Sequence, residues 1–211
     1  MRKNTLHDPK ALLRKKIVRA ASEVFGRYGY RKTTVEDIAM QLHMVKSSLY
    51  YYFRGKEDIF NAVVNCEARK VRRHLLAILE QNDDPRTRLR KYILARMEAL
   101  KEIAGRYPSI FDPTLTHYDF IENIRRKYDR SEQMTIRRIL QEGMSRDVFY
   151  MQDPSLAATV ICTAMKGLEI PFYWRKKEGQ RFYHVDNLLH LLFYGLVKRT
   201  TGEGSGGSTK E

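Results

Sequence analysis

The sequence lacks the features that mark a secreted, membrane or metal-binding protein. No apolar run approaches the ~20 residues that span a bilayer, and residues 1–9 lack the apolar stretch of a secretory signal. Cys66 and Cys162 are far apart and form no C-x-x-C pair, and the histidines include no H-x-x-x-H pair. We therefore expect a soluble intracellular protein with ordinary buried thiols, no structural metal and no membrane partner.

Catalytic motifs are also missing. The chain contains no G-x-S-x-G, phosphate-binding P-loop or H-E-x-x-H sequence, and no pair of carboxylates is placed for acid–base chemistry. The expectation is a protein that is not an enzyme and carries no cofactor.

Acidic residues are the minority, with 25 Asp and Glu against 39 Lys and Arg, which leaves a net charge of +14. Residues 1–60 hold 13 basic and 6 acidic residues, a net of +7, so half of the surplus lies in less than a third of the chain. The first nineteen residues alone contain Arg2, Lys3, Lys10, Arg14, Lys15, Lys16 and Arg19. This cluster predicts an edge that binds the phosphates of a polyanion such as nucleic acid. The alternative is a solvated basic helix face.

Apolar residues recur at helical spacing almost everywhere, and no strand pattern interrupts them. The spacing predicts helices at about residues 13–28, 34–42, 45–54, 56–82, 85–105, 118–144, 155–177 and 185–199. Gly29 is expected to end the first of these helices, and Thr34 to cap the second with Asp37 near its positive end. The fold class is therefore all-α.

Residues 34–54 have the pattern of a helix, a tight turn and a second helix. In a helix-turn-helix, the second helix lies in the major groove of DNA and the first braces it. The apolar residues that support this packing are Ile38, Ala39, Leu42, Leu49 and Phe53. The second helix begins with polar side chains that can reach phosphates and base edges.

The run from Thr34 to Ile59 resembles the DNA-binding signature of the TetR/AcrR family of transcriptional regulators. The matching positions are Thr34, Ile38, Ala39, Lys46, Leu49, Tyr50, Tyr51, Phe53, Lys56 and Glu57, and the segment from Ala20 to Phe25 with Gly29 and Tyr30 is also similar. The chain departs from the family pattern in three places. Leu42-His43 replaces Ala-Gly in the turn, which predicts a positive φ at a residue that is not glycine. Val45 replaces a capping serine, and Tyr52 replaces a histidine.

The resemblance implies two domains. Residues 1–55 would form a three-helix DNA-binding domain with a basic N-terminal arm, and residues 56–200 a larger helical domain for effector binding and dimerisation. Residues 201–211, rich in Gly and Ser, would form a flexible tail. The resemblance also implies a cytoplasmic location, on the nucleoid of a bacterial or archaeal cell.

The family resemblance and the helix-turn-helix pattern together predict which side chains contact DNA. The predicted set is Thr33, Thr34, Lys46, Ser47, Ser48, Tyr50, Tyr51 and Lys56. Lys46 and Ser47 are expected to read base edges, while Ser48, Tyr50 and Lys56 match positions that contact phosphates. A purely capping role is the alternative for Thr34, and packing into the core is the alternative for Tyr51 or Tyr52.

The last third of the chain is expected to form a homodimer interface. One domain reads too few base pairs for selectivity, so a dimer on a palindromic operator is predicted. The expected interface residues are Ala157, Ile161, Ala164, Leu188, Leu189, Leu192, Phe193 and Leu196. The alternative is that these helices only fill the core of their own domain.

The C-terminal domain is expected to bind a small-molecule effector. The candidate lining residues are Tyr107, Phe111, Tyr118, Tyr128, Met165, Phe172 and Trp174, and the alternative for each is plain core packing. The function predicted is a repressor of transcription that a largely hydrophobic or acyl-CoA-like effector releases from double-stranded DNA. An activator, a ligand-independent regulator and a non-specific nucleic-acid-binding protein are the alternatives.

Overall fold

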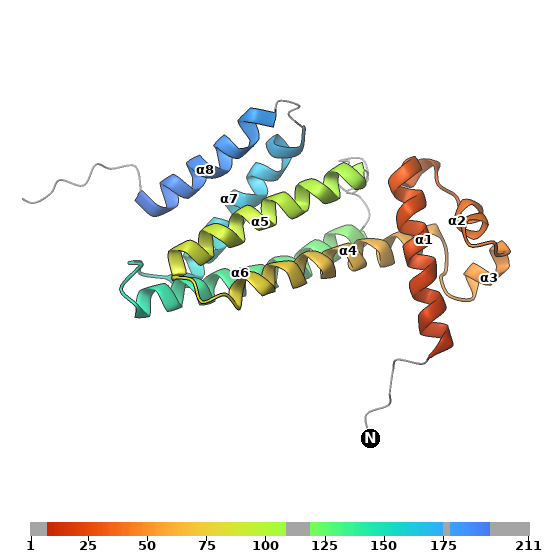
Figure 1. Ribbon diagram of the computed structural model, residues 1–211, viewed down its shortest axis with the longest axis horizontal. Helices are drawn as coiled ribbons and strands as arrows, with labels where there is room; N and C mark the ends of the chain where they lie inside the picture. The colour runs from red at the N-terminus through yellow and green to blue at the C-terminus, as the bar shows by residue number, and fades with distance from the viewer. Residues whose placement is uncertain (1–7, 109–118, 175–177, 195–211) are drawn as a thin grey trace, which may run out of the picture.

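The computed structural model describes residues 8–108, 119–174 and 178–194, and within these ranges its regular structure is entirely helical. The helices are α1 (Pro9–Lys32), α2 (Val35–Gln41), α3 (Lys46–Tyr50), α4 (Lys56–Leu79), α5 (Pro85–Arg106), α6 (Asp119–Ser145), α7 (Pro154–Trp174) and α8 (Glu178–Tyr194). The predicted all-α fold is confirmed. Figure 1 shows α1, α2 and α3 at one end of the molecule, with α4 leading from them into the bundle of α5 to α8.

The first helix changes direction at Gly29. Its φ of 76° and ψ of 164° are not helical, and a positive φ of this size favours glycine. One short turn follows, and Thr33 closes it by donating from its backbone N–H and its hydroxyl to the Gly29 carbonyl at 3.3 and 2.8 Å. Helical geometry is therefore interrupted where the sequence predicted that the helix ends.

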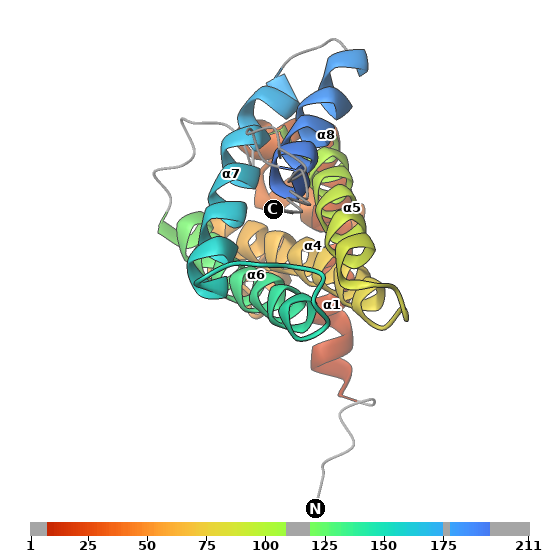
Figure 2. The same cartoon turned by 90° about the vertical axis from the view of Figure 1, so that its left-hand side faces the viewer.

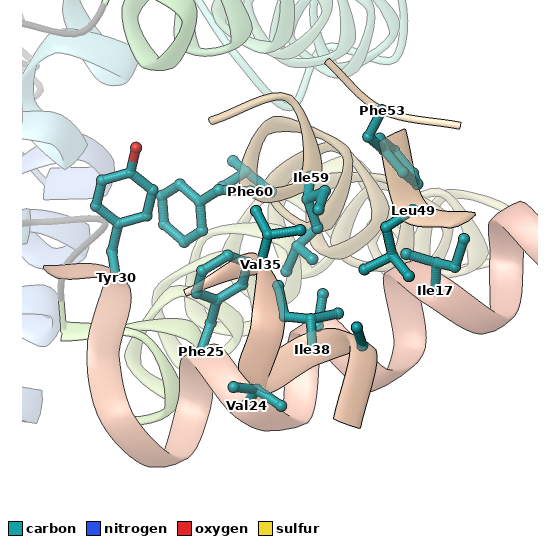
Figure 3. Close-up of a cluster of buried hydrophobic side chains, with 14 of the residues drawn as sticks. Ile17, Val24, Phe25, Tyr30, Val35, Ile38, Leu49, Phe53, Ile59 and Phe60 are labelled. Carbon is teal, nitrogen blue, oxygen red and sulfur yellow. The ribbon is translucent and has the colours of Figure 1, made fainter. Parts of the chain in front are cut away.

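Buried side chains of the described residues form two cores. The first core lies between α1, α2, α3 and the start of α4 (Figure 3) and contains Ile17, Ala21, Val24, Phe25, Tyr30, Val35, Ile38, Ala39, Leu49, Phe53, Ile59, Phe60, Val63, Val64 and Tyr107. The ring of Phe60 lies 5.0 Å from that of Phe25 and 4.6 Å from that of Tyr30, centroid to centroid. Burying side chains of this size contributes roughly 1.5–3 kcal/mol each.

The second core fills the C-terminal bundle. It contains Leu75, Ile78, Leu89, Tyr92, Ile93, Met97, Ile136, Ile139, Leu140, Ala158, Ile161, Cys162, Met165, Val185 and Leu189. Two ion pairs join α5 to α6, Arg88 with Glu142 at 2.5 Å and Arg96 with Glu132 at 2.6 Å. Cys162 is buried and Cys66 half-buried, and both are free thiols. Burial raises the pKa of Cys162 to about 12, so this thiol is neutral at physiological pH.

The long helix α4 belongs to both cores. Its 24 residues span about 36 Å at 1.5 Å per residue. Ile59 and Phe60 at its start are in the first core, and Leu75 and Ile78 near its end are in the second. α4 therefore connects α1 to α3 with the C-terminal bundle through shared packing.

The last helix begins earlier than the sequence predicted. α8 starts at Glu178, whereas the apolar spacing gave a start near residue 185, and its described part ends at Tyr194. Among the described helices, none combines the length and the apolar character needed to cross a membrane.

Candidate nucleic-acid interface

Reciprocal hydrogen bonds fix the start of α2. The Asp37 N–H donates to the Thr34 hydroxyl at 3.1 Å, and the Thr34 N–H donates to the Asp37 carboxylate at 2.7 Å. The Thr34 hydroxyl also donates to that carboxylate, at 2.7 Å, and these two bonds from Thr34 hold the pKa of Asp37 below its ordinary value. The predicted cap is confirmed, and the reciprocal bond completes a capping box.

Replacing Thr34 with alanine is expected to lower the free energy of unfolding by about 1 kcal/mol, because the Asp37 N–H at the start of α2 loses its partner. Urea unfolding followed by circular dichroism measures the loss. The matched control is Thr163→Ala in the middle of α7, where the hydroxyl donates to the carbonyl of Thr159 and caps nothing. Equal losses in the two variants would contradict the capping role.

The turn between α2 and α3 places His43 in the left-handed region, with a φ of 52°. The Met44 N–H donates to the Ala39 carbonyl at 2.9 Å and closes the turn. The positive φ predicted for this position is confirmed, and a residue other than glycine there costs of order 1 kcal/mol.

The helix α3 packs through one side and exposes the other. Leu49 is fully buried in the first core, whereas Lys46, Ser47 and Tyr50 are exposed and Ser48 is half-buried. The N-cap position, residue 45, provides no side-chain cap, as predicted. The exposed polar face of α3 is therefore the one that can enter a groove of DNA.

An exposed ion pair links α2 to α3. The Lys46 Nζ lies 3.2 Å from the Glu36 carboxylate. Exposed pairs contribute little net stability, so the ammonium can exchange this partner for a phosphate or a base edge at small cost.

The beginning of α1 lies beside the end of α3. The Lys10 Nζ is 4.5 Å from the centroid of the Tyr51 ring, and the Arg14 guanidinium is 4.5 Å from that of Phe53. Tyr51 is 69% exposed, whereas Tyr52 is half-buried against the first core. Of the two tyrosines, Tyr52 is the one that packs. The basic residues of α1 therefore border the exposed face of α3.

Lys56, at the start of α4, contacts the end of α1. Its Nζ donates to the carbonyls of Tyr30 and Arg31 at 3.1 and 3.4 Å and lies 4.6 Å from the centroid of the Tyr30 ring. A cation at the carbonyl end of a helix is favourable. An ammonium has three N–H donors, so Lys56 can hold α1 against α4 and still contact a phosphate.

Thr33 does not belong to this surface. Its side chain is 1% exposed, and its hydroxyl donates to the Gly29 carbonyl. The prediction that Thr33 contacts phosphate is wrong, because this threonine closes the end of α1.

The predicted dimer residues divide between the interior and the surface of the bundle. Ile161 and Leu189 are 4% and 1% exposed and belong to the second core, so their assignment to an interface is wrong. Ala157, Leu188, Leu192 and Phe193 are partly buried against the same core, and Ala164 is half-buried. Leu196 lies outside the described residues.

Other apolar side chains of α7 and α8 face outward. Leu156 and Val160 on α7 are 62% and 55% exposed, and Leu191 on α8 is 44% exposed. Gly167, further along α7, has open space around it. The outward residues of α7 are offset from the predicted ones by one position, which is a rotation of roughly 100° about the helix axis. Apolar spacing alone does not distinguish these two faces.

The residues predicted to bind the effector do not all lie together in the described part of the structure. Met165 is fully buried in the second core, and Tyr128 is half-buried against the first. Phe111 and Tyr118 lie outside the described residues, as do the side chains of Phe172 and Trp174. Tyr107 is 1% exposed and lies in the first core, which agrees with the alternative of plain core packing.

Tyr107 follows the last residue of α5 and joins three helices through its hydroxyl. The hydroxyl donates to the Glu67 carboxylate of α4 at 3.3 Å and forms a second hydrogen bond with the Ser22 hydroxyl of α1. Because a tyrosine has one hydroxyl proton, Ser22 is the donor in the second bond. The Glu67 carboxylate also lies 2.8 Å from the Lys70 Nζ. Burial raises the pKa of Tyr107, so the hydroxyl keeps its proton.

Comparisons with known proteins match both parts of the chain. A model described as "Bacterial regulatory proteins, tetR family" matches residues 17–63, and one described as "Tetracyclin repressor-like, C-terminal domain" matches residues 85–182. The first covers most of α1, all of α2 and α3 and the start of α4, and the second covers α5, α6, α7 and the start of α8.

Individual transcriptional regulators are also similar to this chain. The HTH-type transcriptional regulator QacR of Staphylococcus aureus is 23% identical over 189 residues, which cover 88% of this chain and 99% of that protein. The biofilm operon negative transcriptional regulator IcaR of the same species is 39% identical over 54 residues, 26% of this chain and 29% of that protein. Several curated relatives are thus matched over less than a third of their own length. A solved structure of a candidate fatty acid metabolism regulator from Clostridium perfringens is 27% identical, with a TM-score of 0.64, and covers 87% of this chain and 99% of that one.

Proposed function

Because the chain belongs to the TetR family of HTH-type transcriptional regulators, we propose that it is a homodimeric repressor that binds a palindromic operator in double-stranded DNA. A small effector, largely hydrophobic or acyl-CoA-like, binds the C-terminal domain and releases the repressor from the operator. Regulators of this family are not enzymes. The observation that carries the proposal is the exposed polar face of α3, bordered by cations of α1.

In the proposed complex, α3 enters the major groove and two kinds of contact form. Lys46 and Ser47 read base edges, since both are exposed at the start of the helix. Tyr50, Tyr51, Lys56 and Ser48 contact phosphates, and the ammonium of Lys10 lies beside Tyr51. A phosphate contact of Thr34 requires its hydroxyl to exchange the Asp37 carboxylate for a phosphate oxygen. Phosphate contacts position the protein, and base contacts select the sequence.

Substitution at two phosphate-contacting positions is expected to weaken binding to all DNA sequences alike. Tyr50→Phe removes a hydroxyl and no charge, so it lowers affinity without changing its salt dependence. Lys56→Gln removes one cation and is expected to reduce the slope of log K against log salt by about one unit. Fluorescence anisotropy of labelled duplexes over a salt series measures both effects.

The control for charge is Arg73→Gln, an exposed position on α4 far along the helix from Lys56. Its slope is expected to equal that of the unchanged protein. A slope for Lys56→Gln that equals the control's would contradict the phosphate contact, whatever the variant does to stability.

Dimerisation is proposed to use the outward apolar face of α7 and α8. Leu156, Val160 and Leu191 are exposed large apolar side chains, and the open space at Gly167 permits close approach of a second helix. A dimer with two-fold symmetry presents two α3 helices, and a spacing of about 34–36 Å fits successive major grooves on one side of DNA.

The effector is proposed to act through α4 and α5, which connect the bundle to the DNA-binding domain. α4 contributes to both cores, and Tyr107 of the C-terminal part is buried among residues of α1, α2 and α4. An effector that favours a different tilt of these helices changes the spacing of the two α3 helices. The free energy of operator binding then weakens by at most the difference between the effector's binding free energies for the two conformations.

The proposed acyl-CoA-like character of the effector, apolar with an anionic group, has two sources of support. The candidate Clostridium perfringens relative is described as a fatty acid metabolism regulator. Residues 61–211 carry 26 basic and 19 acidic residues, a net of +7, which favours an effector with an anionic group. An acyl-CoA combines an apolar chain with such a group.

In vitro selection tests the proposed function with the full chain and random duplex DNA. The selected sequences are expected to converge on a palindrome whose half-sites are about one helical turn apart. Enrichment without a common sequence would contradict sequence-specific repression and would favour a non-specific nucleic-acid-binding protein.

A further inference from the structure

A pocket opens on the surface of the bundle between the start of α5 and the end of α8. It has a volume of about 370 Å³, at the lower end of the range for small-molecule sites. Figures 1 and 2 both show α5 and α8 as neighbours in this part of the molecule, away from α1 to α3. The DNA-binding surface and the residues predicted for effector binding do not contribute to it.

The polar side of the pocket is cationic. Arg86 and Arg90 line it from α5, and His190 lines it from α8, while no Asp or Glu is among its described lining residues. The N–H groups of Arg86 and Thr87 at the start of α5 are already taken by the Asp84 carboxylate, at 3.0 and 3.1 Å. A ligand in this pocket is therefore held by side chains and not by the free end of a helix.

The Arg86 guanidinium is held in place by aromatic rings. It lies 5.1 Å from the centroid of the Phe193 ring and 4.9 Å from that of Tyr194, and it donates to the Tyr194 hydroxyl. Phe193 in turn stacks on Phe149, with centroids 6.4 Å apart and planes 6° from parallel. A stacked guanidinium keeps N–H donors at its edge for a carboxylate and loses little freedom on binding.

The other walls of the pocket are apolar or planar. Leu189 lies at its base as part of the second core, and the rings of His190 and Tyr194 are 4.8 Å apart at its rim. A ligand that fits this lining has a compact planar apolar body and one negative charge. Inorganic phosphate carries the negative charge that the arginines favour, but it has no apolar surface to pack against Leu189 and the aromatic rings.

We propose that this pocket binds a small aromatic carboxylate. Its carboxylate pairs with Arg86 and Arg90, and its ring lies against Leu189, Phe193 and His190. The evidence for this site is a pocket that α3 does not form and whose lining does not include Leu156, Val160 or Leu191 of the proposed dimer face.

Calorimetric titration of the full chain with benzoate tests the proposal, with benzamide and inorganic phosphate as comparison probes. Benzoate is expected to bind saturably with one site per chain. Benzamide has the same ring without the charge, and phosphate has charge without a ring, so each is expected to bind at least tenfold more weakly. Arg86→Gln and Arg90→Gln are each expected to weaken benzoate binding at least tenfold, and Arg72→Gln, an exposed position on α4, to leave it unchanged.

Several results would overturn the site. These are an absence of saturable benzoate binding, equal affinity for benzoate and phosphate, or an equal effect of the Arg72 and Arg90 substitutions. Arg90→Gln leaves the stack of Arg86 on Phe193 intact, so it remains informative if Arg86→Gln disturbs the fold. The titration reads binding directly, so failure of the operator experiments above does not affect its outcome.

Discussion

Val160→Glu is expected to convert the proposed dimer into a monomer and to lower operator affinity by about 100-fold or more. Val160 is 55% exposed on the outward face of α7, next to Leu156 at 62%. A dimer that buries this face would bring two such carboxylates into an apolar contact, where burial of an unpaired charge is strongly unfavourable. A monomer retains its own α3 but loses the second half-site. Sedimentation equilibrium measures the mass, and anisotropy with the selected operator measures the affinity.

The matched control places the same charge on another exposed apolar side chain. Leu76 is 38% exposed on α4, away from the outward face of α7. Leu76→Glu is expected to leave both the dimer and the operator affinity unchanged. A dimeric Val160→Glu protein with full affinity would contradict the proposed interface, even if the chain dimerises through another surface.

Tyr107→Ala is expected to destabilise the DNA-binding domain by about 3–5 kcal/mol, although residue 107 lies outside that domain in the sequence. The ring is enclosed in the first core, and its hydroxyl links Ser22 of α1 to Glu67 of α4. Removing it leaves a cavity and takes one partner from a buried carboxylate. Hydrogen exchange read by mass spectrometry is expected to show loss of protection in α1 and α2.

Met97→Ala is the control for a large core truncation elsewhere. Met97 is buried in the second core, so its loss of about 2–5 kcal/mol is expected to appear as exchange in α5 to α7 and not in α1. The same exchange pattern in the two variants would contradict the separate cores and the link through Tyr107. Tyr107→Phe keeps the ring and isolates the hydroxyl, and it is expected to show a smaller change in the same peptides.

The sequence predicted the helices and the DNA-binding unit well because both depend on local patterns. Apolar spacing located most helices to within a few residues, and the cap at Thr34 and the positive φ at His43 followed from residue types at fixed positions in a known motif. Such features depend on neighbours a few residues away, which the sequence displays directly.

Features that depend on distant contacts could not be predicted in this way. Thr33 and Thr34 are adjacent and chemically alike, yet one hydroxyl closes α1 and the other begins α2. Tyr107 was a candidate for effector binding as one of the aromatic residues of the C-terminal domain, and the fold brings its hydroxyl to Ser22 of α1. Ile161 was assigned to an interface although it lies in the second core, because the inward and outward faces of α7 both carry apolar side chains.

The most direct test of sequence-specific DNA binding is a competition titration at one fixed salt concentration. The full chain is titrated with the selected operator and with a shuffled duplex of the same length and base composition. A specific regulator is expected to prefer the operator by roughly 10³-fold or more, with two chains bound per duplex. A ratio near one would contradict the proposed function, because phosphate contacts alone would then account for the binding.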